Sequence, residues 1–223
     1  MDEKRFGHPY YRYMAFLLIV IAIGGFALHG VIKPGNLPPV HGFLILHLAA
    51  MVGWYVLFVL QTQLIGRKKH KVHMKLGSLS AILAITIVVS GLAITYLSYR
   101  RTADAVIVLA NFATLLNFGT LYVLGYIYRR KAEFHRRAML LAGIAIIAPA
   151  IARFIITVDL PLPTVFVFYL LLILSLVAFD AIKFKRIHRL SIIGGGAIFV
   201  ILLGAFMFGA TEGWGAFIRS VWG

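Results

Sequence analysis

Histidine is the residue type in this chain best able to do chemistry, and several histidines lie in or next to long apolar segments. His41 and His47 fall in the stretch HGFLILHLAAMVGW (41–54), while His73 and His135 each follow a basic cluster and open another apolar run. An imidazole inside hydrocarbon needs a hydrogen-bond partner, a metal or a proton-relay role. The chain has no cysteine, which excludes iron–sulfur clusters, thiolate zinc sites and covalently attached c-type haem. Any metal must then be held by His, Met, carboxylate or backbone groups.

His41 and His47 do not form a chelating pair. They are six residues apart, which on a regular helix is about 240° of net rotation and about 9 Å of rise. We expect His41 to lie at the membrane interface and His47 about two turns deeper, on one face with Trp54 and Gln61. Three roles stay open for His47: a hydrogen bond to a neighbouring helix, for example to Asn111, ligation of haem or a metal, or proton relay.

Other polar residues are expected on the same, outer side as His47, and together they could form an outer polar pocket: His29, His41, His47, Asn111, Arg153 and Asp159. Arg153 follows Pro149, and a proline kink would turn its side chain inward. The alternative is an Arg153 that extends to the interface and pairs with Asp159.

His73 and His135 occupy similar sequence frames. LFVLQTQLIGRKKHKVHMKLG (57–77) resembles LYVLGYIYRRKAEFHRRAML (121–140): a helix end, a basic loop, and a His that opens the next span. The spans at 41–65 and 76–99 would then be a parallel repeat of those at 103–128 and 137–157. In this repeat His73 matches His135, and His47 matches Asn111. Repeats of this kind often hold functional groups at their interface.

The two histidine layers are too far apart for one small site, because His47 lies about 27 Å from the inner end of its helix. Two layers near opposite faces are typical of an electron path through two b-type haems. Lys75, Arg136 and Arg137 could then bind the propionates of the inner haem. We expect His70 and His188 to be solvated contacts with lipid headgroups.

The elements that must position these residues are membrane-spanning helices. Hydrophobic residues make up 61% of the 223 residues and charged residues only 13%, a balance that a soluble domain of this size could not bury. Apolar runs long enough to cross a bilayer recur along the chain. They fall at about 14–32, 41–65, 76–99, 103–128, 137–157, 162–182 and 190–211.

Charge placement predicts the orientation and one class of partner. The net charge is +15, but the basic residues form short clusters between apolar runs, which favours contact with anionic membrane lipids and not with nucleic acid. With the N-terminus inside, 17 of the 22 Lys and Arg lie on the inner side. We therefore predict an all-α integral membrane protein with seven transmembrane helices, N-in and C-out, as a single domain over 1–223. The first apolar run is expected to be a retained helix, since no small-residue cleavage site follows the N-terminal MDEKRFGHPYYRYM.

A family resemblance rests on His47-to-Gln61 (HLAAMVGWYVLFVLQ), HMKLG (73–77) and HRRAMLLA (135–142) together with Arg153. The chain resembles a group of bacterial multi-span membrane proteins without an assigned activity. More loosely, it is similar to the CtaM-like proteins, small four-helix proteins required for cytochrome oxidase assembly. The shared part covers about 41–157, the motif-bearing core. The resemblance implies that His47, His73, His135 and Arg153 matter, in a respiratory or haem-related setting in the bacterial inner membrane.

Three functions remain open from the sequence. The leading hypothesis is a membrane protein that binds haem b, or a His-ligated copper, iron or zinc ion, and serves electron transfer or respiratory oxidase assembly. The expected ligands are His47, His73 and His135, with His29, Arg153 and Asn111 as further cofactor contacts and His41 as a further metal ligand. The second hypothesis is a non-catalytic assembly or partner-binding protein with structural histidines. The third is a metal-dependent lipid hydrolase or oxygenase using a carboxylate such as Asp180 or Asp159.

Overall fold

The computed structural model describes residues 9–223, which fold into helices with no strand in that range. Seven segments, counting Ala132–Thr157 as one, are long and apolar enough to cross a membrane, so the predicted seven-helix all-α architecture is confirmed. The elements are α1 (Pro9–Ile32), the short 3-10 helix η1 (Pro34–Asn36), α2 (Gly42–Gly66), α3 (His70–Thr102), α4 (Ala105–Ile127), α5 (Ala132–Ala145), α6 (Ala148–Thr157), α7 (Thr164–Phe184), α8 (Arg189–Gly209) and α9 (Glu212–Trp222).

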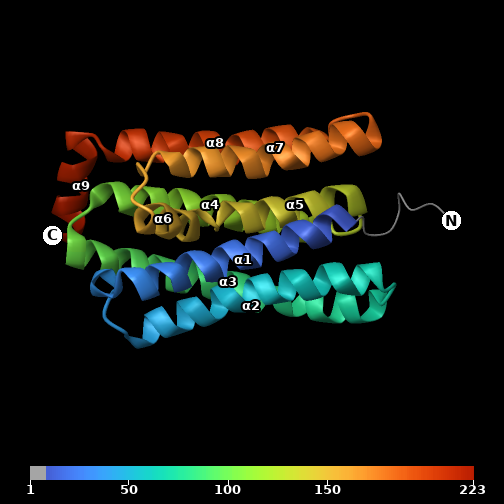
Figure 1. Cartoon of the computed structure of the whole chain (residues 1–223), viewed down its shortest axis with the longest axis horizontal. Coiled ribbons are helices and arrows are strands. Elements are labelled where there is room, and N and C mark those ends of the chain that lie inside the picture. The colour runs from blue at the N-terminus through green and yellow to red at the C-terminus, as the bar shows by residue number, and fades with distance from the viewer. Residues whose placement is uncertain (1–8) are drawn as a thin grey trace.

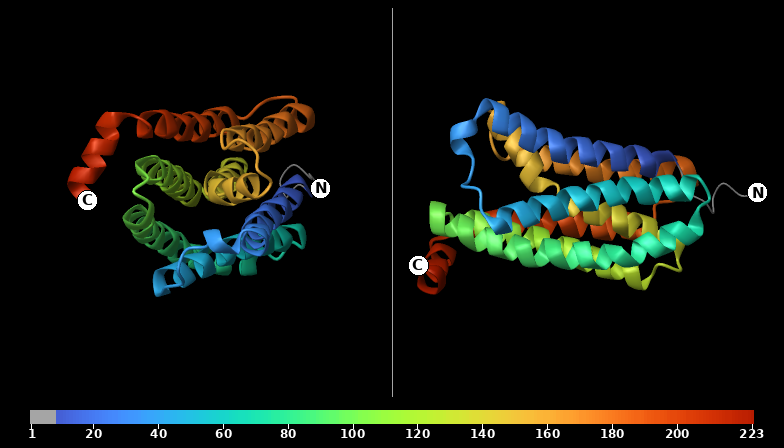
Figure 2. Two further views of the ribbon diagram at one scale, coloured as in Figure 1. Left: turned by 60° about the vertical axis from the view of Figure 1, so that its left-hand side comes forward. Right: turned by 90° about the horizontal axis from the view of Figure 1, so that it is seen from below.

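The fifth span, formed by α5 and α6, is the centre of the molecule. It lies with α4 in a middle layer between the α7–α8 pair and the α1–α2–α3 group (Figures 1 and 2). In its most apolar window 67% of the residues are buried, compared with 22% in each of the first three spans. Its small residues allow this close packing. Side chains on α5 are therefore placed by helices on both sides of that layer.

A proline interrupts this central span, as expected. Pro149 has no N–H, so the Ala145 carbonyl, four residues earlier, has no helical donor. The buried Tyr169 hydroxyl on α7 donates to that carbonyl, and the buried Tyr55 hydroxyl on α2 donates to the Gly143 carbonyl at 2.9 Å. Backbone groups at membrane depth must find partners inside the protein, and here two tyrosines supply them.

Removing one of these hydroxyls should destabilise the bundle. In Tyr169→Phe the Ala145 carbonyl is left buried without its donor, and we expect a loss of about 1–3 kcal/mol in the free energy of unfolding. Tyr13→Phe is the matched control, because Tyr13 is 71% exposed, and it should change little. Denaturant unfolding in detergent, followed by circular dichroism, measures both. Equal stabilities for the two variants would contradict the role assigned to Tyr169.

The connections at one end of the bundle are strongly basic. We call it the basic end: here α2, α4 and α7 end and α3, α5 and α8 begin, joined by the segments 67–69, 128–131 and 185–188. These segments contain Lys and Arg clusters, whereas α9 lies at the opposite end (Figure 1). Which end faces the cytoplasm stays a prediction from charge, and Lys4 and Arg5, counted in it, lie outside the described residues.

Several boundaries differ from the prediction. Helix α1 begins at Pro9 and the fifth span at Ala132, each five residues earlier than expected. The third span was expected to begin at residue 76, but α3 begins at His70, so its 33 residues extend about 50 Å and exceed the roughly 30 Å hydrocarbon core. Its polar first turns therefore project beyond the apolar layer, and His70 and His73 are helical. Helix α9 was not predicted; the Thr211 side chain caps it, and the Trp214 indole N–H donates to the Ala105 carbonyl at 2.7 Å.

Candidate functional site

His73 and His135 lie close together at the basic end. Each is the fourth residue of its helix, and each backbone N–H starts the helical hydrogen bonding by donating to Lys69 or Lys131. Their imidazole centroids are 6.3 Å apart, with ring planes at 85°. The internal repeat stays a prediction, but the two residues that it equates occupy corresponding helix positions and face one another's helices.

The protonation pattern of the His135 ring follows from its hydrogen bond. Its Nδ1 lies 2.8 Å from the Gly125 carbonyl oxygen, and because a carbonyl only accepts, Nδ1 carries the proton. In the neutral ring, Nε2 then holds the lone pair. Helices α4 and α5 approach closely at this point, since a Cβ on Gly125 would lie 2.5 Å from the Met139 Cε atom and 3.0 Å from the Ala138 Cβ atom. An imidazole oriented by a carbonyl in this way is the usual arrangement of a metal-binding His.

His73 is positioned from α2. The Gln61 amide donates to the His73 carbonyl at 3.2 Å, which ties the first turn of α3 to the end of α2. The His73 Nδ1 atom is buried, and residues 9–223 give it no hydrogen-bond partner. His47, Trp54 and Gln61 follow one another along α2 at heptad spacing. The helix face that these three residues were predicted to share therefore leads towards His73.

A cavity of about 770 Å³ encloses both rings. Its walls include the apolar side chains of Trp54, Leu57, Phe58 and Met139, from α2 and α5. Its basic lining residues are Arg12, Arg129, Arg130 and Arg136 together with His70. The volume falls within the range of about 300–1,000 Å³ typical of small-molecule and cofactor sites. An amphipathic molecule with an anionic end fits such a lining.

Buried polar atoms without partners gather in this cavity. Those that residues 9–223 leave without a hydrogen bond here are Tyr11 Oη, Trp54 Nε1, Gln61 Oε1, His73 Nδ1, and Arg136 Nε and Nη2. Outside the cavity, the same condition is found only at His29 Nε2 within that range. Buried polar groups in proteins are almost always hydrogen-bonded. The cavity is therefore built for a polar ligand or for ordered water.

The histidines predicted at the outer side each have a separate local partner. His29 Nδ1 is 2.9 Å from the Thr157 hydroxyl on α6, and His47 Nδ1 is 2.9 Å from the Ser90 hydroxyl on α3. His41 Nδ1 accepts from the Leu44 N–H and caps α2. The partner of His47 is thus a serine and not Asn111. No contact among the three histidines is found within the described chain.

Arg153 and Asp159 do not pair with each other. Asp159 accepts from Lys33, whose ammonium also donates to the Ile156 carbonyl at 2.7 Å. Lys33 follows α1 and reaches the end of α6, so the alternative of an Arg153–Asp159 pair is wrong. Arg153 is half-buried on α6, with its carbonyl accepting from Thr157 at 2.7 Å. Asn111 is half-buried on α4.

The local role of His47 leads to a prediction. His47→Ala removes the bond to Ser90 and should lower the free energy of unfolding by about 1–3 kcal/mol, without altering ligand binding in the cavity at the basic end. Ligand content and denaturant unfolding should be measured on the same purified sample. Loss of a bound cofactor in a folded His47→Ala protein would contradict this role and make His47 a ligand.

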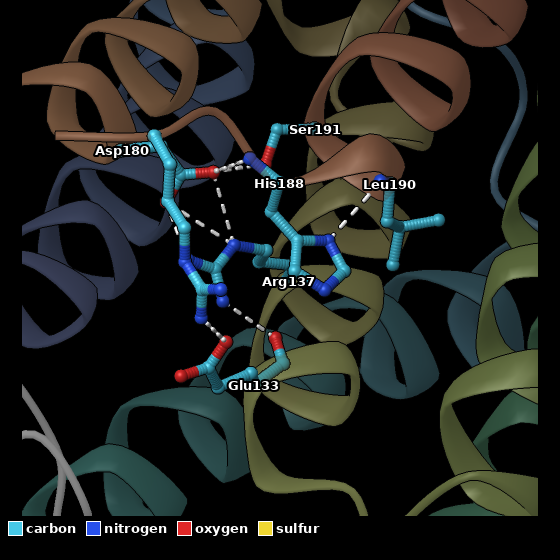
Figure 3. Close-up of polar contacts among 7 residues, drawn as sticks. Glu133, Arg137, Asp180, His188, Leu190 and Ser191 are labelled. Carbon is cyan, nitrogen blue, oxygen red and sulfur yellow. Dashed lines mark hydrogen bonds and ion pairs between the residues drawn. The ribbon is translucent and has the colours of Figure 1, made fainter. Parts of the chain in front are cut away.

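A buried ion pair beside the cavity was not predicted as a pair. The Arg137 guanidinium, 2% exposed, donates to both oxygens of Asp180, which is fully buried (Figure 3). The Ser191 hydroxyl and the His188 N–H also donate to Asp180, at 2.6 and 3.2 Å, and Arg137 donates to the Glu133 carbonyl at 2.7 Å. Burial and the charge of Arg137 lower the pKa of His188. The network joins α5, α7 and α8 next to His135.

Only one of the three cations predicted for haem propionates lines the cavity. Lys75 is exposed and lies outside the lining, and Arg137 is engaged by Asp180. Arg136 does line it, with buried nitrogen atoms that have no partner among residues 9–223. The neighbouring arginines of the HRR motif therefore have different roles.

A bare metal ion is poorly served by these residues. Structural and catalytic zinc sites use three or four protein ligands. Within residues 9–223 no group of three or more His, Asp or Glu lies close enough to share an ion. Asp180 and Asp159, the carboxylates considered for a lipid-modifying metal site, are both in ion pairs. The residues present thus fit a copper, iron or zinc ion less well than a cofactor that needs two protein ligands.

Comparison with protein-family models, curated proteins and solved structures finds no match to this chain. The fold is that of a multi-pass helical membrane protein, and a cavity lined by two neighbouring histidines lies at its basic end.

Proposed function

We propose that the protein binds haem b in the cavity at the basic end, with His73 and His135 as the two axial ligands. The observation that carries this proposal is the approach of two imidazoles, from the starts of α3 and α5, inside one amphipathic cavity. The two residues come from different helices, and neither forms an ion pair with a carboxylate within residues 9–223.

The ring separation supports this reading. Two imidazoles that bind opposite faces of one haem iron, each through a bond of about 2.0 Å, have centroids roughly 6 Å apart. The observed 6.3 Å agrees with that value, and the angle of 85° between the rings is compatible with it because each ring can rotate about its metal–nitrogen axis. Direct packing of the two rings alone would not need a surrounding cavity of this size.

The number of protein ligands also favours haem over a bare ion. The porphyrin provides four nitrogen atoms to the iron, so two histidines complete six-coordination. When bound, haem b supplies one-electron redox chemistry. The chain's own residues would orient and enclose it: Gly125 holds the His135 ring, Gln61 holds the start of α3, and apolar side chains of α2 and α5 exclude water.

The cellular setting follows from charge and resemblance. Electron transfer or respiratory oxidase assembly in the bacterial inner membrane, with respiratory-chain or oxidase proteins as partners, is what the CtaM-like resemblance implies. The apolar outer faces of the spans would contact membrane lipids. With the basic end inside, as the positive-inside rule predicts, the haem would lie near the cytoplasmic face.

A second function is favoured by the other histidines. The Nδ1 atoms of His29, His41 and His47 each have a hydroxyl or a backbone N–H as partner, as expected of structural residues in a non-catalytic assembly or partner-binding protein. Under that function His73 and His135 would only pack the helix ends. The two functions differ in a measurable property, the presence of a cofactor.

Haem content of the purified protein tests the proposal. The protein should be expressed in cells supplied with a haem precursor, purified in mild detergent, and assayed for its Soret band and for iron. We expect about one iron per chain, extracted as haem b. A folded protein that contains no haem, and that gives no Soret shift when titrated with haem b in lipid nanodiscs, would contradict the proposal and favour the second function.

A further inference from the structure

Arg136 lies in the wall of the cavity with its charge unmatched. Its guanidinium carbon lies over the rings of Tyr11 and Phe184, at 5.4 and 5.3 Å from their centroids. The Nε and Nη2 atoms are buried and have no hydrogen-bond partner among residues 9–223. Stacking on two rings stabilises the cation and fixes its plane, but it satisfies none of these N–H groups.

The acidic side chains closest in sequence and space are engaged elsewhere. The Asp180 carboxylate accepts hydrogen bonds from Arg137, from the Ser191 hydroxyl and from the His188 N–H. The Glu133 carboxylate forms an ion pair with Arg186 at 3.4 Å. The ion pairs found within residues 9–223 do not include Arg136. A buried charge without a partner is costly. Arg136 is half-buried, and its buried Nε and Nη2 groups can donate to an anion that these residues do not provide.

The other arginines of the cavity do not have this property. Arg12 is half-buried on α1, but none of its nitrogen atoms is among the buried atoms that residues 9–223 leave without a partner. Arg129 and Arg130 are exposed, and Arg129 donates to the Tyr126 carbonyl and stacks on the Tyr126 ring. Such side chains remain hydrated whether or not a ligand is present. Arg130 is thus a suitable control for a general electrostatic effect, since it has the same charge and lines the same cavity.

We propose that the cavity selects ligands carrying a carboxylate, and that Arg136 is the residue that binds it. The inference rests on the proposed function in taking this cavity as the ligand site, but it specifies the ligand class: an amphipathic acid. The planar fork of Arg136 can donate two N–H groups to one carboxylate. The Tyr11 hydroxyl lies beside Arg136 in the same cavity, and it can donate a third hydrogen bond.

Two chemical sources could supply this carboxylate: a propionate of haem b or the head group of a free fatty acid. The apolar walls formed by Trp54, Leu57 and Phe58 accept the hydrocarbon part of either. The experiment therefore uses two matched pairs of probes, each differing only in the acid. These are haem b with its dimethyl ester, and oleate with methyl oleate.

Binding should be titrated on the full chain in nanodiscs of a neutral phospholipid. The Soret shift reports the haem pair. For the fatty acid pair, quenching of Trp54 fluorescence is measured in a Trp214→Phe/Trp222→Phe background, which leaves Trp54 as the reporter inside the cavity. We expect the acid of the physiological pair to bind about 10- to 100-fold more tightly than its ester.

The variants show whether Arg136 causes that preference. Arg136→Gln should abolish the difference between acid and ester, while Arg130→Gln should keep it. The comparison of acid with ester in the unmodified protein does not depend on whether Arg136→Gln folds. If haem b does not bind but oleate binds better than methyl oleate, the haem proposal fails and this inference stands. Equal binding of acid and ester in both pairs, or an acid preference that persists in folded Arg136→Gln, would overturn it.

Discussion

His135→Ala is expected to remove the bound haem from the purified protein. Under the proposed function the variant deletes one of the two residues that would hold the haem, and the Gly125 carbonyl loses its imidazole donor. His73→Ala should have the same effect, because a single remaining imidazole cannot complete six-coordination. We expect each variant to retain less than about a tenth of the wild-type haem, since even loss of a residue that only orients a ligand reduces metal affinity about 10- to 100-fold. Haem is quantified per folded chain after extraction.

The control for this prediction is His41→Ala. His41 caps α2 at the opposite end of the bundle, so its replacement costs about 1 kcal/mol of stability but should leave haem content unchanged. Rescue provides a second readout: free imidazole should restore the haem spectrum of His135→Gly. Wild-type haem content in His73→Ala and His135→Ala would show that the ligands lie elsewhere.

The second large effect is expected at the Arg137–Asp180 pair. Asp180→Asn or Arg137→Met leaves a buried charge without its partner, and each should lower the free energy of unfolding by about 3–5 kcal/mol. In Asp180→Asn the Ser191 hydroxyl and the His188 N–H also lose their charged acceptor. Denaturant unfolding in detergent, scored by circular dichroism and by the retained monomer peak in size exclusion, measures the loss.

Two comparisons separate charge burial from general disruption. The double variant Arg137→Met/Asp180→Leu should be less destabilised than either single variant, because an apolar pair carries no uncompensated charge. Arg186→Gln removes an exposed pair with Glu133, whose side chains are 75% and 43% exposed, and should cost less than about 1 kcal/mol. Strict additivity of the two buried substitutions would contradict the assignment of Arg137–Asp180 as a coupled pair.

The seven spans could be predicted because hydropathy and chain length act locally. Each span needs about 20 apolar residues, and basic clusters and prolines separate the runs. The correspondence of His73 with His135 was also visible, since it depends on short motifs that begin two helices. The two histidines lie in one cavity because α3 packs against α4 and α4 packs against α5. The predicted repeat made the two histidines equivalent but did not predict this packing.

Partners between distant helices could not be predicted. Ser90 and Thr157 bond to His47 and His29, but a serine or threonine in an apolar helix usually bonds to its own backbone, so neither stands out in sequence. Consecutive residues on a helix differ by about 100° in direction. Arg137 therefore points towards Asp180, while Arg136 lines the cavity. The HRR motif alone does not indicate which of the two arginines faces the cavity.

The interrupted span shows the same limit. Pro149 predicts an interruption of the helix. The hydroxyl groups that donate to the freed backbone carbonyls belong to Tyr55 on α2 and Tyr169 on α7. Their role depends on the position of α5–α6 in the centre of the bundle (Figure 2). Local patterns predict where a helix is interrupted, while the groups that stabilise the interruption follow from tertiary packing.

The spectrum of the oxidised wild-type protein tests the central claim most directly. Purified protein in nanodiscs, loaded with one equivalent of haem b, should be measured by optical absorption and electron paramagnetic resonance. Two histidine ligands predict a six-coordinate low-spin ferric haem whose signal is lost in His73→Ala and in His135→Ala. A high-spin ferric signal in the wild-type protein, or a low-spin signal that both variants retain, would contradict the assignment of His73 and His135 as its ligands.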